Sequence, residues 1–154
     1  EMSASLVGSE MCIRDSVEKV GINLADARIP DNAGEQPSDE PLQADGPTAY
    51  FATIPVKAMV QNVREHGLPC HVSFTAGTYV CNCVMYNVLH LCATKYPNIR
   101  AGFIHVPFAC EQVVGKASTM ASMPLETIAK SLEYCIEAVV TNKEEVKEAM
   151  GTTH

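Results

Sequence analysis

The sequence predicts an α/β fold, with a mostly parallel, twisted sheet between two layers of helices in a three-layer α/β/α arrangement. Strand and helix patterns alternate along the chain in the order strand, loop, strand, helix, strand, helix, strand, helix. Such alternation is typical of layered α/β proteins. In addition, the 154 residues are 47% hydrophobic and 19% charged, which provides enough apolar material for the core of one domain.

The first half of the chain supplies two predicted strands and one predicted helix. Residues 20–24 and 49–53 are short apolar runs that favour strands, and the polar residues 26–46 between them predict a long loop. A helix is expected to start at Pro55 and to stop before Gly67, because these residue types mark helix ends. Its apolar residues recur at helical spacing, at Val56, Met59, Val60 and Val63.

The second half continues the alternation. Residues 70–74 and 99–108 are predicted strands. Between them, residues 83–93 predict a buried helix that a following proline closes. Apolar residues at helical spacing over 125–139 predict an amphipathic helix, and the charged tail at 143–148 is expected to fray.

The charge and the cysteine content argue against several classes of protein. The formal net charge is -7 and no cluster of Lys and Arg stands out, so a nucleic-acid partner is not expected. No apolar run approaches the roughly 18 residues of a membrane-spanning helix, so no membrane association is expected. The seven cysteines are irregularly spaced and lack a CxxC pair, which indicates reduced thiols and a cytoplasmic location. They are Cys12, Cys70, Cys81, Cys83, Cys92, Cys110 and Cys135.

The turn at residues 75–82 places a cysteine at the start of a helix. This turn follows the strand at 70–74, and Cys81 falls at or near the first turn of the helix that comes next. The unpaired N–H groups and the partial positive charge of a helix N-terminus stabilise a thiolate, which is the nucleophilic form of cysteine. We therefore interpret Cys81 as a catalytic nucleophile. The alternative is a small, buried apolar residue.

A thiolate nucleophile needs a base and a group that orients the base. His105 is the natural base, because it lies at the end of an apolar strand, where α/β folds bind their ligands. The alternative is a core histidine. For the orienting acid, Glu18 and Asp26 flank the first predicted strand, and the pattern does not choose between them. The histidines that fit the role of base less well are His66, His71, His90 and His154.

A zinc site is the main rival interpretation. Its ligands would be Cys81, Cys83, His90 and His105. Residues two apart on a helix point in different directions, and the usual C-x₂₋₄-C spacing is absent. A simple redox role for Cys81 lacks a resolving CxxC partner. The spacing therefore favours a nucleophile over a metal ligand.

Three long motifs stand out at residues 17–32, 77–82 and 102–107, with the cores VGINLADARIPDN, GTYVCN and GFIHVP. In their order and spacing they resemble pyroglutamyl peptidase I, also called pyrrolidone-carboxylate peptidase. Residues 45–51 also match, and the resemblance covers about residues 17–140. It implies a cysteine peptidase that removes N-terminal pyroglutamyl residues from peptides through an acyl-enzyme. It implies no metal or organic cofactor, and a homo-oligomer, since the family commonly forms tetramers.

The resemblance also implies roles for individual residues. Cys81 matches the nucleophile, His105 the base and later the acid, and Glu18 the residue that orients His105. Glu18 is thereby preferred over Asp26. Arg28 matches a residue close to the oxyanion, which the Cys81 N–H would also bind. The positions that match the wall of the pyroglutamyl pocket are Ile29, Tyr79 and Val80.

The chain also departs from the family pattern. Residues 1–16 have no clear period and resemble translated sequencing-adapter read-through, so we expect a non-native segment there and a partial catalytic domain over 17–150. We expect the family's N-terminal strand and its aromatic turn to be missing, which would leave unpaired ladder groups. This chain should then be aggregation-prone and nearly inactive, and its full-length parent an active peptidase. The alternative function is a non-catalytic α/β binding or assembly domain.

Overall fold

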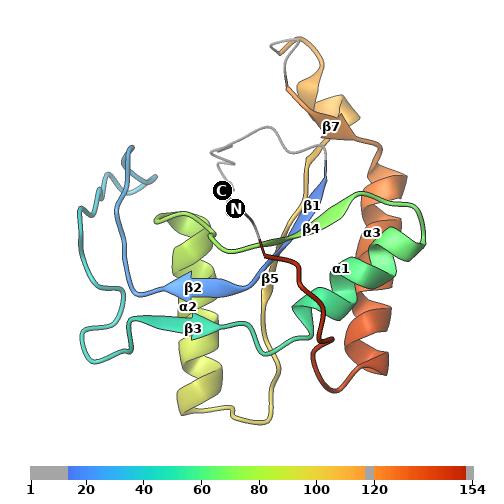
Figure 1. Ribbon diagram of the computed structural model, residues 1–154. Coiled ribbons are helices and arrows are strands. Elements are labelled where there is room, and N and C mark those ends of the chain that lie inside the picture. Colours follow the sequence, from blue (N-terminus) through green and yellow to red (C-terminus); the bar gives the residue numbers. More distant parts are fainter. Residues whose placement is uncertain (1–13, 117–119, 152–154) are drawn as a thin grey trace.

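The computed structural model describes residues 14–116 and 120–151. Within these residues, no helix has both the length and the apolar character needed to span a bilayer. Figure 1 shows the arrangement of the elements. The strands are β1 (Asp15–Glu18), β2 (Val20–Ile22), β3 (Ala49–Phe51), β4 (Cys70–Ser73), β5 (Phe103–His105), β6 (Phe108–Ala109) and β7 (Ser122–Met123). The helices are α1 (Val56–Glu65), α2 (Val80–Thr94), α3 (Leu125–Thr141) and the short 3₁₀ helix η1 (Cys110–Val113).

The central sheet has the strand order β4-β1-β5. β1 runs parallel to β4 and antiparallel to β5. Two further pairs stand beside it: β2 with β3, which are antiparallel, and β6 with β7, which are parallel. The predicted α/β class is confirmed. The expectation of mostly parallel strands is met by two of these pairings, whereas the other two are antiparallel.

The helices lie on both sides of the central strands, with α1 and α3 on one side and α2 on the other (Figure 1). The helix α2 packs against β2 and β3. This close approach favours a glycine, because a side-chain carbon at Gly21 would lie 3.1 Å from the Tyr86 backbone nitrogen, and one of the two would have to shift. The core is apolar and includes Val17, Val56, Met59, Val60, Val63, Val72, Met85 and Leu89.

Most predicted elements are confirmed. The expected strands at 49–53 and 70–74 are β3 and β4, and the expected helices are α1, α2 and α3. Pro55 and Pro124 directly precede their helices, and Gly67 follows α1 with a positive φ of 76°. These positions are set by local backbone preferences that a sequence displays directly.

Three expectations need correction. The strand expected at 99–108 is two short strands, β5 and β6, because Pro107 has no N–H to donate to a ladder. The strand expected at 20–24 is only β2, and a further strand, β1, precedes it. The helix α2 is not buried all round, because Val84, Val88 and Leu91 form an exposed apolar face.

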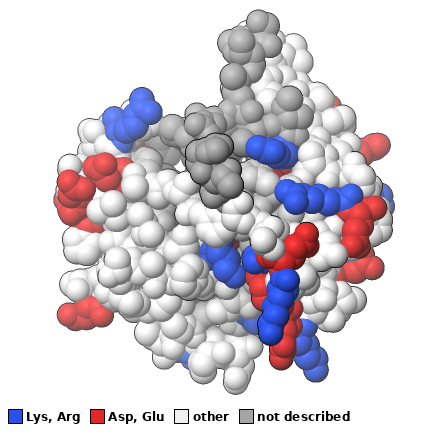
Figure 2. Space-filling model, viewed as in Figure 1, with Lys and Arg blue, Asp and Glu red and all other residues white. Residues whose placement is uncertain are grey.

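The charged tail at 143–148, which is expected to fray, is bonded to the start of α1 in the structure. The Glu145 carboxylate accepts a hydrogen bond from the Lys57 backbone N–H at 2.8 Å and pairs with the Lys19 ammonium at 3.1 Å. A helix N-terminus has unpaired N–H groups and a partial positive charge, so it binds a carboxylate at the start of α1. Figure 2 shows oppositely charged side chains gathered on this side of the viewed face.

Asp15 is a buried carboxylate without a partner. It lies at the start of β1 and is fully buried, and neither of its carboxylate oxygens has a hydrogen-bond partner among the described residues. Burial raises the pKa of Asp15, and the nearby Ser131 hydroxyl offsets this only in part. The thiols of Cys70 and Cys135 are its other close neighbours. The site is therefore suited to an apolar side chain and unfavourable for a charged one.

Asp15 and Ser16 belong to the segment 1–16 that is expected to be non-native, and both are part of β1. Residues 1–13 of that segment lie outside the described residues. The expected boundaries, 1–16 and 17–150, stay predictions.

Replacing Asp15 by valine is expected to stabilise the fold at neutral pH by about 1–3 kcal/mol, the usual cost of burying an unsatisfied polar group. Because the folded state raises the pKa of Asp15, the folded state holds this proton more tightly than the unfolded state. The original chain therefore loses stability as the pH rises through the folded-state pKa. The advantage of Asp15→Val should grow with pH accordingly.

Urea unfolding between about pH 4 and about pH 8, followed by circular dichroism, measures this difference in free energy. Asp45→Val, on an exposed loop, serves as the control and should not change the pH dependence. If the free energy of unfolding depends on pH in the same way in Asp15→Val and the original chain, Asp15 does not cause the loss of stability at higher pH.

Candidate active site

The pairing of β1 with β5 brings a glutamate and a histidine together. Ser16 lies opposite His105 and Glu18 lies opposite Phe103, so these side chains project from the same face of the sheet. The His105 Nδ1 atom lies 2.7 Å from the Glu18 Oε1 atom. The two residues are far apart in the sequence, and the strand register alone makes them neighbours.

The Glu18 carboxylate is deeply buried, with 1% of the residue exposed. Its Oε1 atom also accepts a hydrogen bond from the Ser16 hydroxyl at 3.0 Å. A buried carboxylate without donors is costly, and both of these contacts are made to Oε1, whereas Oε2 has no hydrogen-bond partner among the described residues. The carboxylate holds the His105 ring in one orientation, since Nδ1 is committed to it.

Cys81 is the second residue of α2, so it lies in the first turn of a helix as expected. The turn before it contains Gly77 with a φ of 76°, a conformation that favours glycine. No side chain caps the start of α2, and its first turn contains no acidic residue. The N–H groups there are thus available to stabilise a negative charge on a thiolate or on a substrate oxygen.

The pKa of His105 is raised by two neighbouring side chains, those of Cys81 and Glu18. Hydrogen bonding to the Cys81 side chain, followed by hydrogen bonding to Glu18, raises the pKa of His105 to about 9, although burial opposes this. His105 is therefore protonated at neutral pH. Because Nδ1 contacts Glu18, Nε2 is the ring nitrogen left for the thiol. This arrangement suits a cysteine nucleophile with a histidine that carries a proton to a leaving group.

The acid that contacts His105 is Glu18, while Asp26, the other candidate, is exposed. The backbone of Asp26 bonds instead to Thr78, in the turn before Cys81. The sequence pattern did not choose between the two carboxylates. The register of β1 against β5 makes Glu18 the one that bonds to His105.

The other expected site residues lie on the surface near the ends of these elements. Arg28 is exposed, and among the described residues no hydrogen bond or ion pair joins it to Cys81. Ile29 and Val80 expose 45% and 48% of their surface. Tyr79 is half-buried, and its hydroxyl oxygen has no hydrogen-bond partner in the part of the chain that is described. The roles expected for these residues stay predictions.

Sequence reasoning gave no role to Ser16, Thr78 or Asn82. Ser16 donates to Glu18, Thr78 bonds to Asp26, and Asn82 is a buried polar residue beside Cys81. One signal was visible: asparagine has a low preference for helices, yet Asn82 lies in the first turn of one. The partners of all three are set by the tertiary structure.

The rival zinc interpretation finds no cluster of donors. Across residues 14–116 and 120–151, no group of three or more His, Cys, Asp or Glu side chains is placed to hold a metal ion. His90, one of the four expected ligands, has its Nδ1 atom 3.1 Å from the Tyr50 hydroxyl. It therefore has a partner of its own outside the proposed zinc set.

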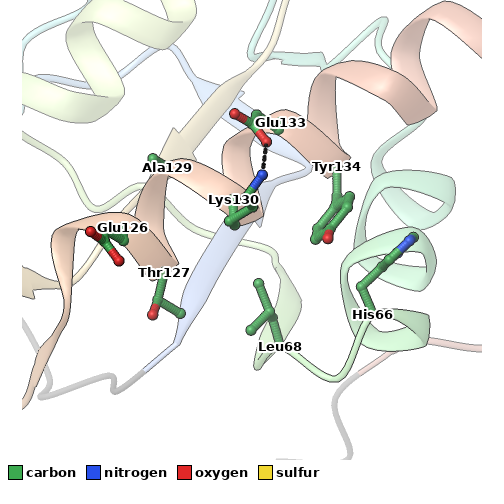
Figure 3. Close-up of a pocket in the computed structure, with 8 residues that line it drawn as sticks. All are labelled: His66, Leu68, Glu126, Thr127, Ala129, Lys130, Glu133 and Tyr134. Atoms are coloured by element: carbon green, nitrogen blue, oxygen red, sulfur yellow. Dashed lines mark hydrogen bonds and ion pairs between the residues drawn. The ribbon is translucent and has the colours of Figure 1, made fainter.

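A separate hollow of about 450 Å³ lies between the end of α1 and the start of α3 (Figure 3). The His66 and Tyr134 rings stack there with their centroids 3.8 Å apart, and Lys130 pairs with Glu133 at 2.8 Å. Neither Cys81 nor the two residues that accompany it line this hollow. It is not part of the candidate active site.

Comparisons with known proteins agree with this geometry. The family model for pyroglutamyl peptidase matches residues 6–142, a match that begins inside the segment expected to be non-native. A pyrrolidone-carboxylate peptidase of Enterococcus faecalis is 61% identical over 139 residues, which are 90% of this chain and 65% of that protein.

Solved structures give the same result. The crystal structure of pyroglutamyl peptidase I from Bacillus amyloliquefaciens has a TM-score of 0.86 at 35% identity, over 92% of this chain and 66% of that one. Pyrrolidone carboxyl peptidase from Thermococcus litoralis has a TM-score of 0.81 at 40% identity, over 86% and 62%. The chain spans slightly less than two thirds of the length of these relatives.

The change Glu18→Gln is expected to lower the pKa of His105 from about 9, because a neutral amide removes the charge that favours the imidazolium. The contact with Cys81 would remain, so the value should stay above the ordinary one. NMR titration of the His105 ring measures the shift. Glu133→Gln, an exposed carboxylate on α3, is the control. An unchanged His105 titration in Glu18→Gln would show that the carboxylate does not influence the ring.

Proposed function

The chain belongs to the pyroglutamyl peptidase family, and from this membership we propose that the whole protein is a cysteine peptidase that removes N-terminal pyroglutamyl residues from peptides. The observation that carries the proposal is the hydrogen bond of His105 to Glu18, with the Cys81 side chain close enough to raise the pKa of His105. A thiol, a histidine and a buried carboxylate in this order form a nucleophile, a proton carrier and an orienting group.

In the proposed reaction, the Cys81 sulfur attacks the carbonyl carbon that joins the lactam residue to the rest of the peptide. The carbon–nitrogen bond breaks, and His105 gives its proton to the departing amine. The lactam residue stays on the sulfur as a thioester. His105 then takes a proton from water, which attacks the thioester and frees the acid, and the proton returns to the site as the thiol re-forms.

The charge on the carbonyl oxygen develops next to the start of α2. The Cys81 N–H is there, and no side chain caps this helix end. Such N–H groups stabilise an oxyanion most in the transition state. We include Arg28 as a further positive charge close to this oxygen, in line with the family resemblance.

Ile29, Tyr79 and Val80 are proposed to form the wall of the lactam pocket. Ile29 and Val80 expose apolar surface, which a neutral ring can cover. A free α-ammonium group would lose its hydration there without gaining a partner. This difference would favour a blocked, pyroglutamyl N-terminus over an ordinary one.

We also propose a cytoplasmic location and self-association. The cysteines that the structure describes are all free thiols, which supports a reducing compartment. The exposed apolar face of α2 at Val84, Val88 and Leu91 supports contact between copies. The proposed substrates are peptides, and no nucleic-acid partner is proposed.

The whole protein is expected to hydrolyse a fluorogenic pyroglutamyl amide, and Cys81→Ser should lower kcat/KM by at least about 10³-fold, because a hydroxyl is a far weaker nucleophile than a thiolate. Cys83→Ser, in the same helix, is the matched control and should stay active. A thiol alkylator should block the original protein. Absence of turnover, or turnover that persists in Cys81→Ser, would favour the alternative, a non-catalytic α/β binding domain.

The pH dependence follows from His105. Its proton is needed for the departing amine, so kcat/KM should fall as the pH rises through about 9, the value to which Cys81 and Glu18 raise the pKa of His105. Glu18→Gln should move this falling limb to lower pH and reduce kcat about 10²–10⁴-fold. Rate profiles of both proteins test this. If kcat/KM falls at the same pH in Glu18→Gln as in the original protein, Glu18 does not set the pKa of the catalytic histidine.

A further inference from the structure

Asn82 is a buried amide with every donor in use. The residue is 1% exposed. Its Oδ1 atom accepts a hydrogen bond from the Ile22 backbone N–H at 2.9 Å. Its Nδ2 group donates to the Ile22 carbonyl at 2.9 Å and to the Leu24 carbonyl at 3.0 Å. The side chain therefore pairs with the end of β2 as a neighbouring strand would.

These hydrogen bonds connect α2, the helix that contains Cys81, to β2, the strand that follows Glu18 in the sequence. Asn82 directly follows Cys81 in the first turn of α2. Its partner strand, β2, directly follows β1, which ends at Glu18. Since Glu18 holds His105, the Asn82 bonds fix where the first turn of α2 lies relative to the Glu18–His105 pair.

A second tie lies on the other side of Cys81. The Asp26 N–H donates to the Thr78 carbonyl at 2.8 Å, and the Thr78 hydroxyl donates to the Asp26 carbonyl at 2.9 Å. The turn before α2 is thus bonded to the loop that continues to Arg28. Bonds at positions 78 and 82 enclose Cys81 between two fixed points.

Local preferences do not account for an asparagine at this position. Asparagine is a poor helix former and is favoured as an N-cap, yet Asn82 is inside the helix and caps nothing. Its contribution comes from bonds to residues sixty positions away in the sequence. A residue retained for helix stability alone would be a better helix former.

We propose that Asn82 is a positioning residue, which holds the Cys81 thiol in reach of His105 by anchoring the first turn of α2 to β2. The proposal rests on the proposed function of Cys81 and His105. Asn82 acts through the backbone and does not touch the substrate. A displacement of about 1 Å at a reacting atom can cost about 10²-fold in rate, so a small shift of this turn is sufficient.

The chain offers a closely matched control in Asn23. Its Nδ2 group donates to the Gln43 and Gly46 carbonyls at 2.8 and 3.2 Å, and its Oδ1 atom accepts from the Gln43 N–H at 2.9 Å. It therefore makes the same kinds of bonds as Asn82, but they join the residue after β2 to a loop and do not involve the first turn of α2. Asn23→Asp and Asn82→Asp remove equivalent donors from two different places.

Three measurements separate positioning from stability. The rate at which iodoacetamide alkylates Cys81, located by peptide mapping, and the NMR titration of His105 need no peptidase activity. Both are measured on the full chain at equal folded fraction, as judged by circular dichroism. The third measurement is kcat and KM for the pyroglutamyl amide with the whole protein. If the whole protein shows no turnover, the proposed function fails, while the first two measurements still decide the role of Asn82.

Asn82→Asp is expected to slow alkylation about 10-fold, to lower the pKa of His105 because its contact with Cys81 weakens, and to reduce kcat about 10–100-fold with a smaller change in KM. Asn23→Asp should lose stability without these three effects. The proposal would be overturned if Asn23→Asp and Asn82→Asp had equal effects. It would also be overturned if Asn82→Asp kept the alkylation rate and the kcat of the original protein. If Asn82→Asp does not fold, Asn82→Ser, which keeps one donor, carries the test. Original values in a folded Asn82→Ser would overturn it.

Discussion

The hydrogen bond between His105 Nδ1 and Glu18 Oε1, 2.7 Å long, is the interaction on which the rest of the site depends. It joins two strands that are distant in the sequence, and it pairs one oxygen of a carboxylate that is 1% exposed. Because a buried carboxylate without donors is costly, the pairing of β1 with β5 and the chemistry of the site support one another. The same bond commits one ring nitrogen and leaves the other for Cys81.

Glu18 and Asp15 are two buried carboxylates on the same short strand, and they differ in their hydrogen-bond donors. Glu18 has two donors on the face of the sheet toward α2, and it orients the histidine. Asp15 lies three residues earlier on the opposite face, against α3, and none of its oxygens is paired among the described residues. Similar burial therefore supports chemistry in one case and opposes folding in the other, because among the described residues only Glu18 has donors hydrogen-bonded to it.

The helix α2 carries the nucleophile, and its placement depends on close packing. Gly21 allows the helix to approach β2, where a larger residue would contact the Tyr86 backbone. Asn82 then fixes the first turn of the helix to the same strand. The packing of α2 against β2 therefore places the Cys81 thiol. It also places the helix N-terminus whose N–H groups stabilise a thiolate.

The sequence by itself determined the local features: the helix start at Pro55, the amphipathic helix over 125–139, the turn that puts Cys81 at a helix start, and the family. These follow from short-range backbone preferences and from motifs that lie in continuous stretches. The tertiary structure decided which acid bonds to His105, why Pro107 splits a strand, and what Asn82 binds. Those outcomes depend on strand register and on hydrogen bonds between residues far apart along the chain, and no local periodicity encodes either of them.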